Sequence, residues 1–223
     1  MITNELIKDV ICNMPKKFSD EEREWIRQKL LTEARHHFET AGLRKTSVED
    51  LTKAAGIAQG SFYMFFGSKE ELYYELILEE EQRIRNAVLD LFPPEEVCSK
   101  ESIKRFLLYS LRMMDESPML RQMMDRGEME LLFRKLPKDL LERNFTEDQD
   151  ALLPVITAWQ KAGILLGTAP ESIVGMIRSL ALLTLHQKEI GEEQFTSTIE
   201  LLVELLSAGM LAVSNTPKGD GAL

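Results

Sequence analysis

Hydrophobic residues recur at intervals of three and four along most of this chain, which is the spacing of one face of an α-helix. The segment from Asp20 to Ala41 is typical, because its apolar positions follow that spacing and Gly42 supplies a natural stop. Leu, Glu, Met, Ala and Lys outnumber Val and Thr, so composition also favours helices over strands. We therefore expect an all-α fold.

Stop and capping residues divide this pattern into successive helices. Two capping boxes are predicted, Ser19 with Glu22 and Thr46 with Glu49. The expected helices cover residues 2–14, 20–41, 46–55, 58–66, 68–92, 103–116, 119–133 (as two shorter helices), 146–162, 171–189 and 192–213. They group into a helical extension (1–18), a head (19–68), a body (69–214) and a disordered tail (215–223).

The segment from Thr46 to Lys69 has the properties of a helix-turn-helix. Small residues at Ala55 and Gly56 let two short helices cross closely at the turn. The candidates for a small common core are Val48, Leu51, Ala54, Ile57 and Phe62. The outer side of the second helix then carries Gln59, Gly60, Ser61, Tyr63 and Met64. Amide and hydroxyl groups at such positions can contact base edges or phosphates, and a glycine allows close backbone approach.

The same segment resembles the N-terminal signature of the TetR family of transcription regulators. The matching positions are Thr46, Ser47, Val48, Leu51, Ala55, Gly56, Gly60, Ser61, Phe62, Tyr63, Phe66, Ser68, Lys69, Glu70 and Leu72. The resemblance covers about residues 25–75, and the body is similar to the family in length and helical content only. It implies an N-terminal three-helix helix-turn-helix DNA-binding domain and a C-terminal helical domain for ligand binding and dimerisation.

The resemblance also implies a set of DNA contacts. These are Arg44, Lys45, Thr46, Ser47, Gln59, Gly60, Ser61, Tyr63, Met64 and Lys69. Thr46, Ser47 and Lys69 would contact phosphates, whereas the residues of the second short helix would face the major groove. The implied protein is a homodimer that binds a near-palindromic operator in double-stranded DNA, as a repressor relieved by a ligand.

Three positions depart from the family pattern. Ala58 replaces the usual Ser or Thr cap, Met64 replaces a polar aromatic residue, and Gly67 replaces a frequent lysine. These changes remove polar and charged groups that DNA binding uses. They leave open an alternative function, a TetR-like helical module that binds another protein and has little affinity for DNA.

The body contains a methionine-rich run between Met113 and Met129. Such a run commonly fills a core adaptably, and it can also line a plastic apolar chamber. In the second case the chamber residues would be Phe106, Tyr109, Met113, Met123, Phe133 and Trp159. The expected effector is then a small hydrophobic molecule.

The last two predicted helices are apolar almost all round, which a helix exposed on one side is not. Their apolar faces need burial against the body and against a second protein surface. A two-fold interface between subunits meets this need, and the expected interface residues are Ile173, Ile177, Leu180, Leu202, Leu206 and Met210. A buried hairpin in a monomer is the alternative.

The charge is unevenly distributed. The formal net charge is −10, but residues 1–69 hold 11 basic against 10 acidic residues and the remainder holds 16 against 27. Between Lys53 and Lys69 there is no acidic residue. An acidic body with such a head is compatible with DNA contact by one end only.

Several function classes lack support in the sequence. No catalytic triad order, nucleophile elbow or phosphate loop occurs, so we expect no enzyme. Cys12 and Cys98 lie far apart without a metal-ligand spacing, so we expect reduced thiols, no metal and no cofactor. No apolar run approaches the length of a membrane span, and the first residues lack the order of a signal peptide, so we expect no membrane partner and a cytoplasmic location.

Overall fold

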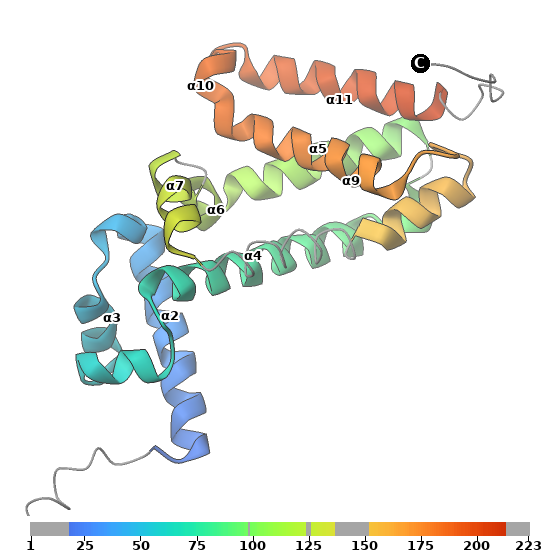
Figure 1. Ribbon diagram of the computed structural model, residues 1–223. Coiled ribbons are helices and arrows are strands. Elements are labelled where there is room, and N and C mark those ends of the chain that lie inside the picture. Colours follow the sequence, from blue (N-terminus) through green and yellow to red (C-terminus); the bar gives the residue numbers. More distant parts are fainter. Residues whose placement is uncertain (1–17, 98, 124–125, 137–151, 213–223) are drawn as a thin grey trace, which may run out of the picture.

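The computed structural model describes residues 18–97, 99–123, 126–136 and 152–212, and all regular structure in these ranges is helical (Figure 1). The all-α fold is therefore confirmed. The predicted helix 2–14, the first residues of the predicted helix 146–162 and the predicted disordered tail lie outside the described residues.

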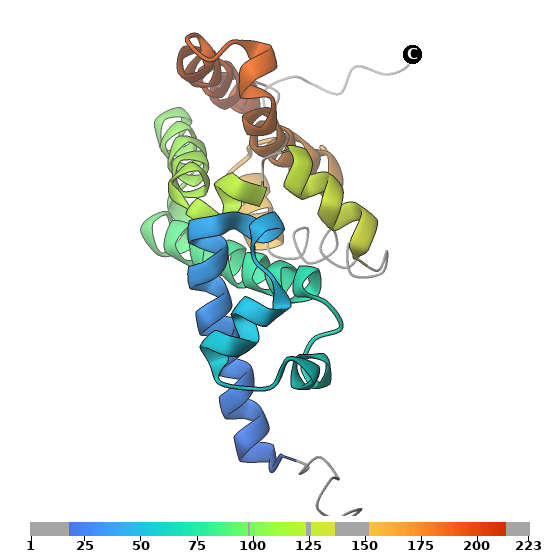
Figure 2. The ribbon, with the colours of Figure 1, turned by 90° about the vertical axis from the view of Figure 1, so that its left-hand side faces the viewer.

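Three elements form the head at one end of the molecule: α2 (Asp20–Lys45), α3 (Val48–Ala55) and the 3-10 helix η1 (Gln59–Met64) (Figures 1 and 2). Leu30, Leu51 and Phe62 are fully buried in its core. The predicted helix 58–66 is therefore present in a shorter and tighter form. As expected, Ala58 gives the N-terminus of η1 no side-chain cap.

The capping of α2 is confirmed, whereas that of α3 differs from the prediction. The hydroxyl of Ser19 accepts the amide of Glu22, and the carboxylate of Glu22 accepts the amide of Ser19. For α3, Ser47 and Asp50 make the same pair of bonds, at 3.1 and 2.9 Å. Thr46 is not the cap, because it is buried and its hydroxyl donates to the carbonyl of Gly42 at 2.8 Å.

The change of cap follows from a kink near the end of α2. Gly42 has φ 81° and ψ 166°, which is not helical, and the chain then makes one further turn to Lys45 before the head continues. A positive φ of this size strongly favours glycine. Gly42 therefore interrupts α2, as a stop signal should, but the helix resumes beyond it.

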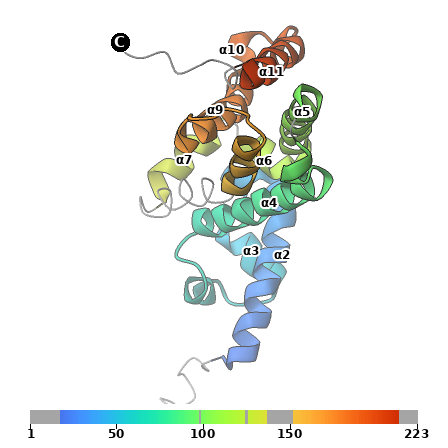
Figure 3. The same ribbon diagram turned by 90° about the vertical axis from the view of Figure 1, so that its right-hand side faces the viewer.

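Helix α4 (Lys69–Leu91) starts in the head and runs on through the body (Figures 1 and 3). The other elements of the body are η2 (Pro94–Glu96), α5 (Lys100–Glu116), α6 (Pro118–Met123), α7 (Arg126–Lys135), a helix over residues 152–161, α9 (Pro170–Leu183), η3 (Thr184–His186), α10 (Gln187–Ile190) and α11 (Phe195–Ala212). Helix α5 packs against α4 on one side and α11 on the other, and α6 packs against α2, α4 and α5. The predicted helix 171–189 is divided at Thr184.

The burial of residues on α9 and α11 differs from what the expected dimer interface requires. Ile173, Leu180 and Met210 are buried within the chain, and Ile177, Leu202 and Leu206 are half-buried. The exposed leucines of these helices are instead Leu182, Leu201 and Leu205. Because both helices are apolar on several faces, spacing alone does not indicate which face meets the body.

Helix α11 has 18 residues, and its length and hydropathy are sufficient to cross a membrane. The expectation that no apolar run approaches that length is therefore wrong. The helix nevertheless packs on α5, and its Glu204 pairs with Lys100 and with Lys104, the latter at 2.8 Å. These two cations hold the pKa of Glu204 at about 2 through hydrogen bonds and charge. Length and composition alone do not distinguish a membrane span from a helix that packs against protein.

Candidate nucleic-acid interface and body cavity

A groove opens where the end of α2, the start of α3, η1 and the start of α4 meet. It is lined by Arg44, Lys45, Thr46, Ser47, Val48, Gln59, Tyr63, Gly67, Ser68, Lys69 and Glu70. The structure therefore brings seven of the ten predicted DNA contacts together in one place. The other three, Gly60, Ser61 and Met64, lie on η1 next to this groove.

The short helix η1 presents an exposed polar face. Tyr63 is 61% exposed and Met64 is 40% exposed, whereas Phe62, which precedes them in η1, is fully buried. Gln59 and Gly60 are exposed, and a Cβ at Gly60 would meet nothing within 4 Å. Gly60 is therefore not required by packing inside the chain. Its small size matters only for something that approaches the head from outside.

Two of the predicted phosphate contacts have a different role in the structure. Thr46 is 2% exposed, so its side chain does not reach solvent. The ammonium of Lys69 donates to the carbonyls of Leu43 and Thr46 at 2.6 and 2.7 Å. These carbonyls lie at the C-terminus of α2, where helical partners are missing. Lys69 thus fastens the start of α4 to the end of α2.

The rim of the groove is basic. Arg44 and Lys45 are exposed in the last turn of α2, where cations also favour the helix dipole. Asp50, the acidic partner of Ser47 in the α3 capping box, has its pKa lowered by the hydrogen bond from the Ser47 hydroxyl. Its charge serves the capping box. The groove therefore combines a cationic rim, the hydroxyl of Tyr63 and the amide of Gln59, which suit phosphates and base edges.

The sequence of this head matches a known family. Residues 30–76 match the model of bacterial regulatory proteins of the TetR family. An uncharacterized HTH-type transcriptional regulator of Bacillus subtilis, YdgC, is 34% identical over 82 residues, which are 37% of this chain and 42% of YdgC. The head of this chain is therefore similar to that of TetR-family regulators. The alignment spans less than half of YdgC, so it supports a similarity of the head and not of the whole protein.

Solved TetR-family structures share the whole fold. A TetR-family regulator from Pectobacterium atrosepticum superposes with a TM-score of 0.67 at 21% identity, over 90% of this chain and 100% of that chain. SmeT, the repressor of a multidrug efflux pump of Stenotrophomonas maltophilia, gives 0.56 at 17% identity, over 82% and 88%. SmeT in complex with triclosan gives 0.53 at 18% identity, over 89% and 98%. At these identities the likeness shows a common TetR fold.

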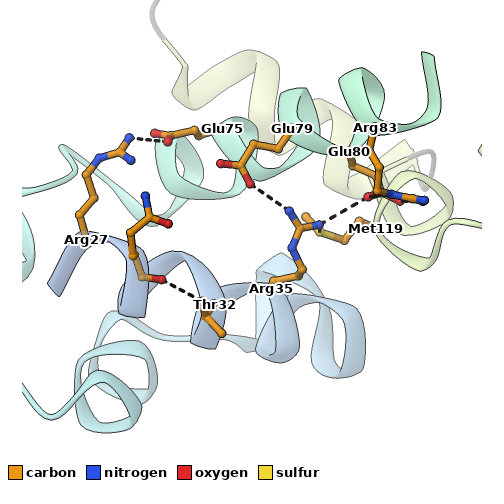
Figure 4. Close-up of polar contacts among 9 residues, drawn as sticks. Arg27, Thr32, Arg35, Glu75, Glu79, Glu80, Arg83 and Met119 are labelled. Atoms are coloured by element: carbon orange, nitrogen blue, oxygen red, sulfur yellow. Dashed lines mark hydrogen bonds and ion pairs between the residues drawn. The ribbon is translucent and has the colours of Figure 1, made fainter. Parts of the chain in front are cut away.

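In this TetR fold, ion pairs connect the head to the body along α4 (Figure 4). Arg27 of α2 pairs with Glu75, and Arg35 pairs with Glu79 at 3.0 Å and with Glu80 at 3.5 Å. Glu80 is 8% exposed in its side chain and also binds Arg83 at 2.8 Å. The pKa of Glu80 is lowered mainly by the hydrogen bonds from Arg83, against an opposing effect of burial. The orientation of the head is therefore tied to α4 by charges on both helices.

The body contains an apolar cavity of about 190 Å³. Its lining residues are Glu81, Ile84, Arg85, Val88, Leu89, Phe106, Ser110, Met114, Leu120, Leu152, Val174, Ile177, Arg178 and Ala181. Five of these come from α4 at helical spacing, a stripe that periodicity could have indicated. Helix α4 therefore connects the head to the body and also lines the cavity.

The predicted chamber residues are only partly placed at this cavity. Phe106 lines it, and Trp159 is fully buried with its ring 5.8 Å from that of Phe106, one layer behind the wall. Tyr109, Met113 and Met123 do not line it, and the side chain of Phe133 lies outside the described residues. The error has a simple cause. The face of α5 that lines the cavity carries Phe106, Ser110 and Met114, which are spaced four residues apart. Tyr109 and Met113 each precede one of these residues and therefore lie on the neighbouring face of the helix.

No cluster of metal-binding side chains occurs among the described residues. His36 and His37 pack edge to face with ring centroids 6.2 Å apart. The head and the cavity therefore offer hydrogen bonds, charge and apolar surface as their chemistry.

We predict that Lys69→Met lowers the free energy of unfolding by about 1–3 kcal/mol, because two carbonyls at the end of α2 lose a charged donor. Urea unfolding followed by circular dichroism measures the change. Lys45→Met is the matched control, since Lys45 is exposed on the same groove, and should shift stability by less than about 0.5 kcal/mol. Equal effects of the two substitutions would contradict a structural role for Lys69.

Proposed function

We propose that this TetR-family protein is a DNA-binding transcription regulator whose head reads an operator with the exposed face of η1. The observation that carries the proposal is the groove in which exposed Gln59 and Tyr63 stand beside the cationic rim of Arg44 and Lys45. The family of the head supports the same function. Such a protein acts where the chromosome is, so we propose a cytoplasmic location and no catalytic activity.

Two groups of residues in the groove are proposed to make two kinds of contact with DNA. The rim residues Arg44, Lys45 and Ser47 contact phosphates and fix the position of the head. Gln59 and Tyr63 reach base edges in the major groove, and Gly60 lets the backbone of η1 approach. Thr46 and Lys69 support this surface from behind.

We propose a homodimer formed through α9 and α11. Leu182, Leu201 and Leu205 are 49%, 59% and 61% exposed, so this end of the molecule presents large apolar side chains to solvent. Leucines gathered on one pair of helices are typical of an interface rather than of a free surface. A two-fold dimer would place two heads about one turn of DNA apart, ~34 Å, and so favour a near-palindromic operator.

The effector of this regulator is proposed to be a small apolar molecule bound in the body cavity. Most of the wall is hydrophobic, and its polar members are Glu81, Arg85, Ser110 and Arg178. The structural similarity to the complex of SmeT with triclosan supports an apolar ligand. We propose that binding relieves repression. It can do so only if the ligand has different affinities for the DNA-bound and free conformations.

Binding to duplex DNA tests the main proposal. We expect Gln59→Ala and Tyr63→Ala each to raise the dissociation constant roughly tenfold or more, since each removes a base contact worth about 1–3 kcal/mol. Fluorescence anisotropy with DNA from the region upstream of the gene, or with duplexes selected from random sequence, measures the affinity. Lys45→Met should reduce the salt dependence by about one phosphate contact.

Gln28→Ala is the matched control for this experiment. Gln28 is also an exposed glutamine of the head, but it bonds Glu24 on α2 and does not line the groove. Its loss should leave DNA affinity unchanged. Salt-insensitive binding, or no selected duplex at all, would contradict DNA reading and favour a protein-binding module instead.

The dimer makes a separate prediction. Leu201→Glu combined with Leu205→Glu should convert the dimer to a monomer, because two buried carboxylates would have no partners in the interface. Light scattering gives the mass. Leu91→Glu is the control, since Leu91 is 53% exposed at the end of α4 and should leave the mass unchanged. A monomeric parent protein would refute the dimer directly.

Ligand binding in the cavity is followed through Trp159. The chain has two Trp residues, so Trp25→Phe leaves Trp159, behind Phe106, as the sole emitter. We expect triclosan to alter its emission and to raise the melting temperature, by a stabilisation of about 2.7 kcal/mol at a hundredfold excess over the dissociation constant. Ala181→Phe, which fills the cavity, should abolish both effects. Identical responses with and without that substitution would place the binding site elsewhere.

A further inference from the structure

The charged side chains of the body cavity indicate the chemical class of its ligand. Of the described residues that line the cavity, Glu81 and Arg85 on α4 and Arg178 on α9 carry formal charges. The wall therefore holds two cations against one anion. This balance is opposite in sign to that of residues 70–223, which hold 16 basic against 27 acidic residues. The charge of the wall is thus a local feature that does not follow from the composition of the body.

The two arginines occupy similar positions in the wall. Arg85 directly follows Ile84 in α4. Arg178 directly follows Ile177 in α9, and both isoleucines line the cavity as well. Ile84 is buried, whereas Arg85 and Arg178 are half-buried. An arginine so placed lays its methylene stem along apolar surface and keeps its guanidinium toward water. The cavity therefore has an apolar interior and guanidinium groups at its edge.

These arginines are the side-chain hydrogen-bond donors that the described wall offers to a ligand. The hydroxyl of Ser110 donates to the carbonyl of Phe106 at 2.7 Å, so its proton serves α5. The ionised carboxylate of Glu81 has acceptors only. A guanidinium has five N–H groups, so Arg85 can keep its bond to Gln82, at 3.0 Å, and bind a ligand with others. A ligand with an acceptor group is therefore matched to this wall.

Guanidinium groups favour a carboxylate over other acceptors. A carboxylate can accept two parallel N–H bonds from one guanidinium, and such charged pairs are shorter and stronger than neutral hydrogen bonds. An alcohol lacks this gain, and an ammonium group is repelled by the two cations. One bound carboxylate also brings the summed charge of the wall and ligand to zero, which lowers the cost of keeping these charges away from water. The wall therefore selects an acidic ligand.

We propose that the effector is a small amphiphile, with its apolar part in the cavity and a carboxylate bound by Arg85 and Arg178. The inference rests on the proposed function, because it names the chemical class of the ligand for the same cavity. The cavity volume of about 190 Å³ is below the roughly 300–1,000 Å³ of drug-sized sites, which favours a small ligand. Octanoate has this chemistry and serves as the probe.

Three probes of equal chain length test the inference. Octanoate, 1-octanol and octylammonium differ in the charge of the end group. In the Trp25→Phe background, the emission of Trp159 measures their dissociation constants, because this ring packs against Phe106 of the wall. We expect octanoate to bind roughly tenfold or more tightly than 1-octanol, and octylammonium to bind more weakly than either.

Substitutions locate the source of this selectivity. Arg85→Met and Arg178→Met should each weaken octanoate binding roughly tenfold and leave 1-octanol binding within about twofold. Arg112→Met is the matched control, because Arg112 is an exposed arginine of α5 that pairs with Glu116 and does not line the cavity. It should change neither constant. Glu81→Gln removes an anion from the wall and should strengthen octanoate binding about threefold or more. A gain of affinity does not arise from misfolding, so this variant decides the matter if an arginine variant does not fold.

The outcomes separate this inference from the proposed function. Octanoate that binds no more tightly than 1-octanol would refute the carboxylate and leave a purely apolar effector standing. A loss of octanoate affinity in Arg112→Met as large as in Arg178→Met would also overturn the inference. If neither triclosan nor any of the three probes binds, the cavity is not a ligand site and both effector proposals fail. Charge-selective octanoate binding by a protein that binds no duplex would refute DNA reading and support the inference.

Discussion

The two hydrogen bonds from the ammonium of Lys69 are the interaction on which the head depends. They join the first residue of α4 to the carbonyls of Leu43 and Thr46, and so hold the start of α4 against the end of α2. Without them the end of α2 would leave two carbonyls unpaired beside a kink that already costs helical bonds. Because Arg44, Lys45 and Ser47 lie within the same few residues, the bonds of Lys69 that stabilise the fold also set the shape of the groove.

The position of this fastening explains how one helix serves two sites. Helix α4 begins at Lys69 in the groove and ends beyond the cavity, to which it contributes Ile84 and Val88. A continuous helix transmits rotation and translation along its axis. This continuity is the physical basis of the proposed coupling between the cavity and the groove.

The sequence predicted the all-α fold and named seven residues that the structure gathers in one groove, because these depend on local signals: helical spacing, capping residues and a dense motif. It failed where the answer depends on which face of a helix meets the body. Met113 and Met114 are adjacent, yet only Met114 lines the cavity. Ile173 and Leu182 are equally apolar, yet one is buried and the other exposed. The capping box at Thr46 failed for a related reason: the sequence indicates a stop at Gly42, but α2 resumes beyond it, and Thr46 is buried with its hydroxyl bonded to the Gly42 carbonyl.

The acidic net charge of −10 is compatible with DNA binding because charge acts locally in salt solution. Helix α4 has 23 residues and is about 35 Å long, whereas the screening length at physiological ionic strength is about 8 Å. The carboxylates in the far half of the body therefore contribute little at the groove, and residues 18–69 hold 8 basic against 8 acidic residues. A head without an excess of positive charge gains little from non-specific attraction to phosphates. The proposed DNA reading therefore relies on contacts of η1, where the exposed amide, hydroxyl and glycine lie.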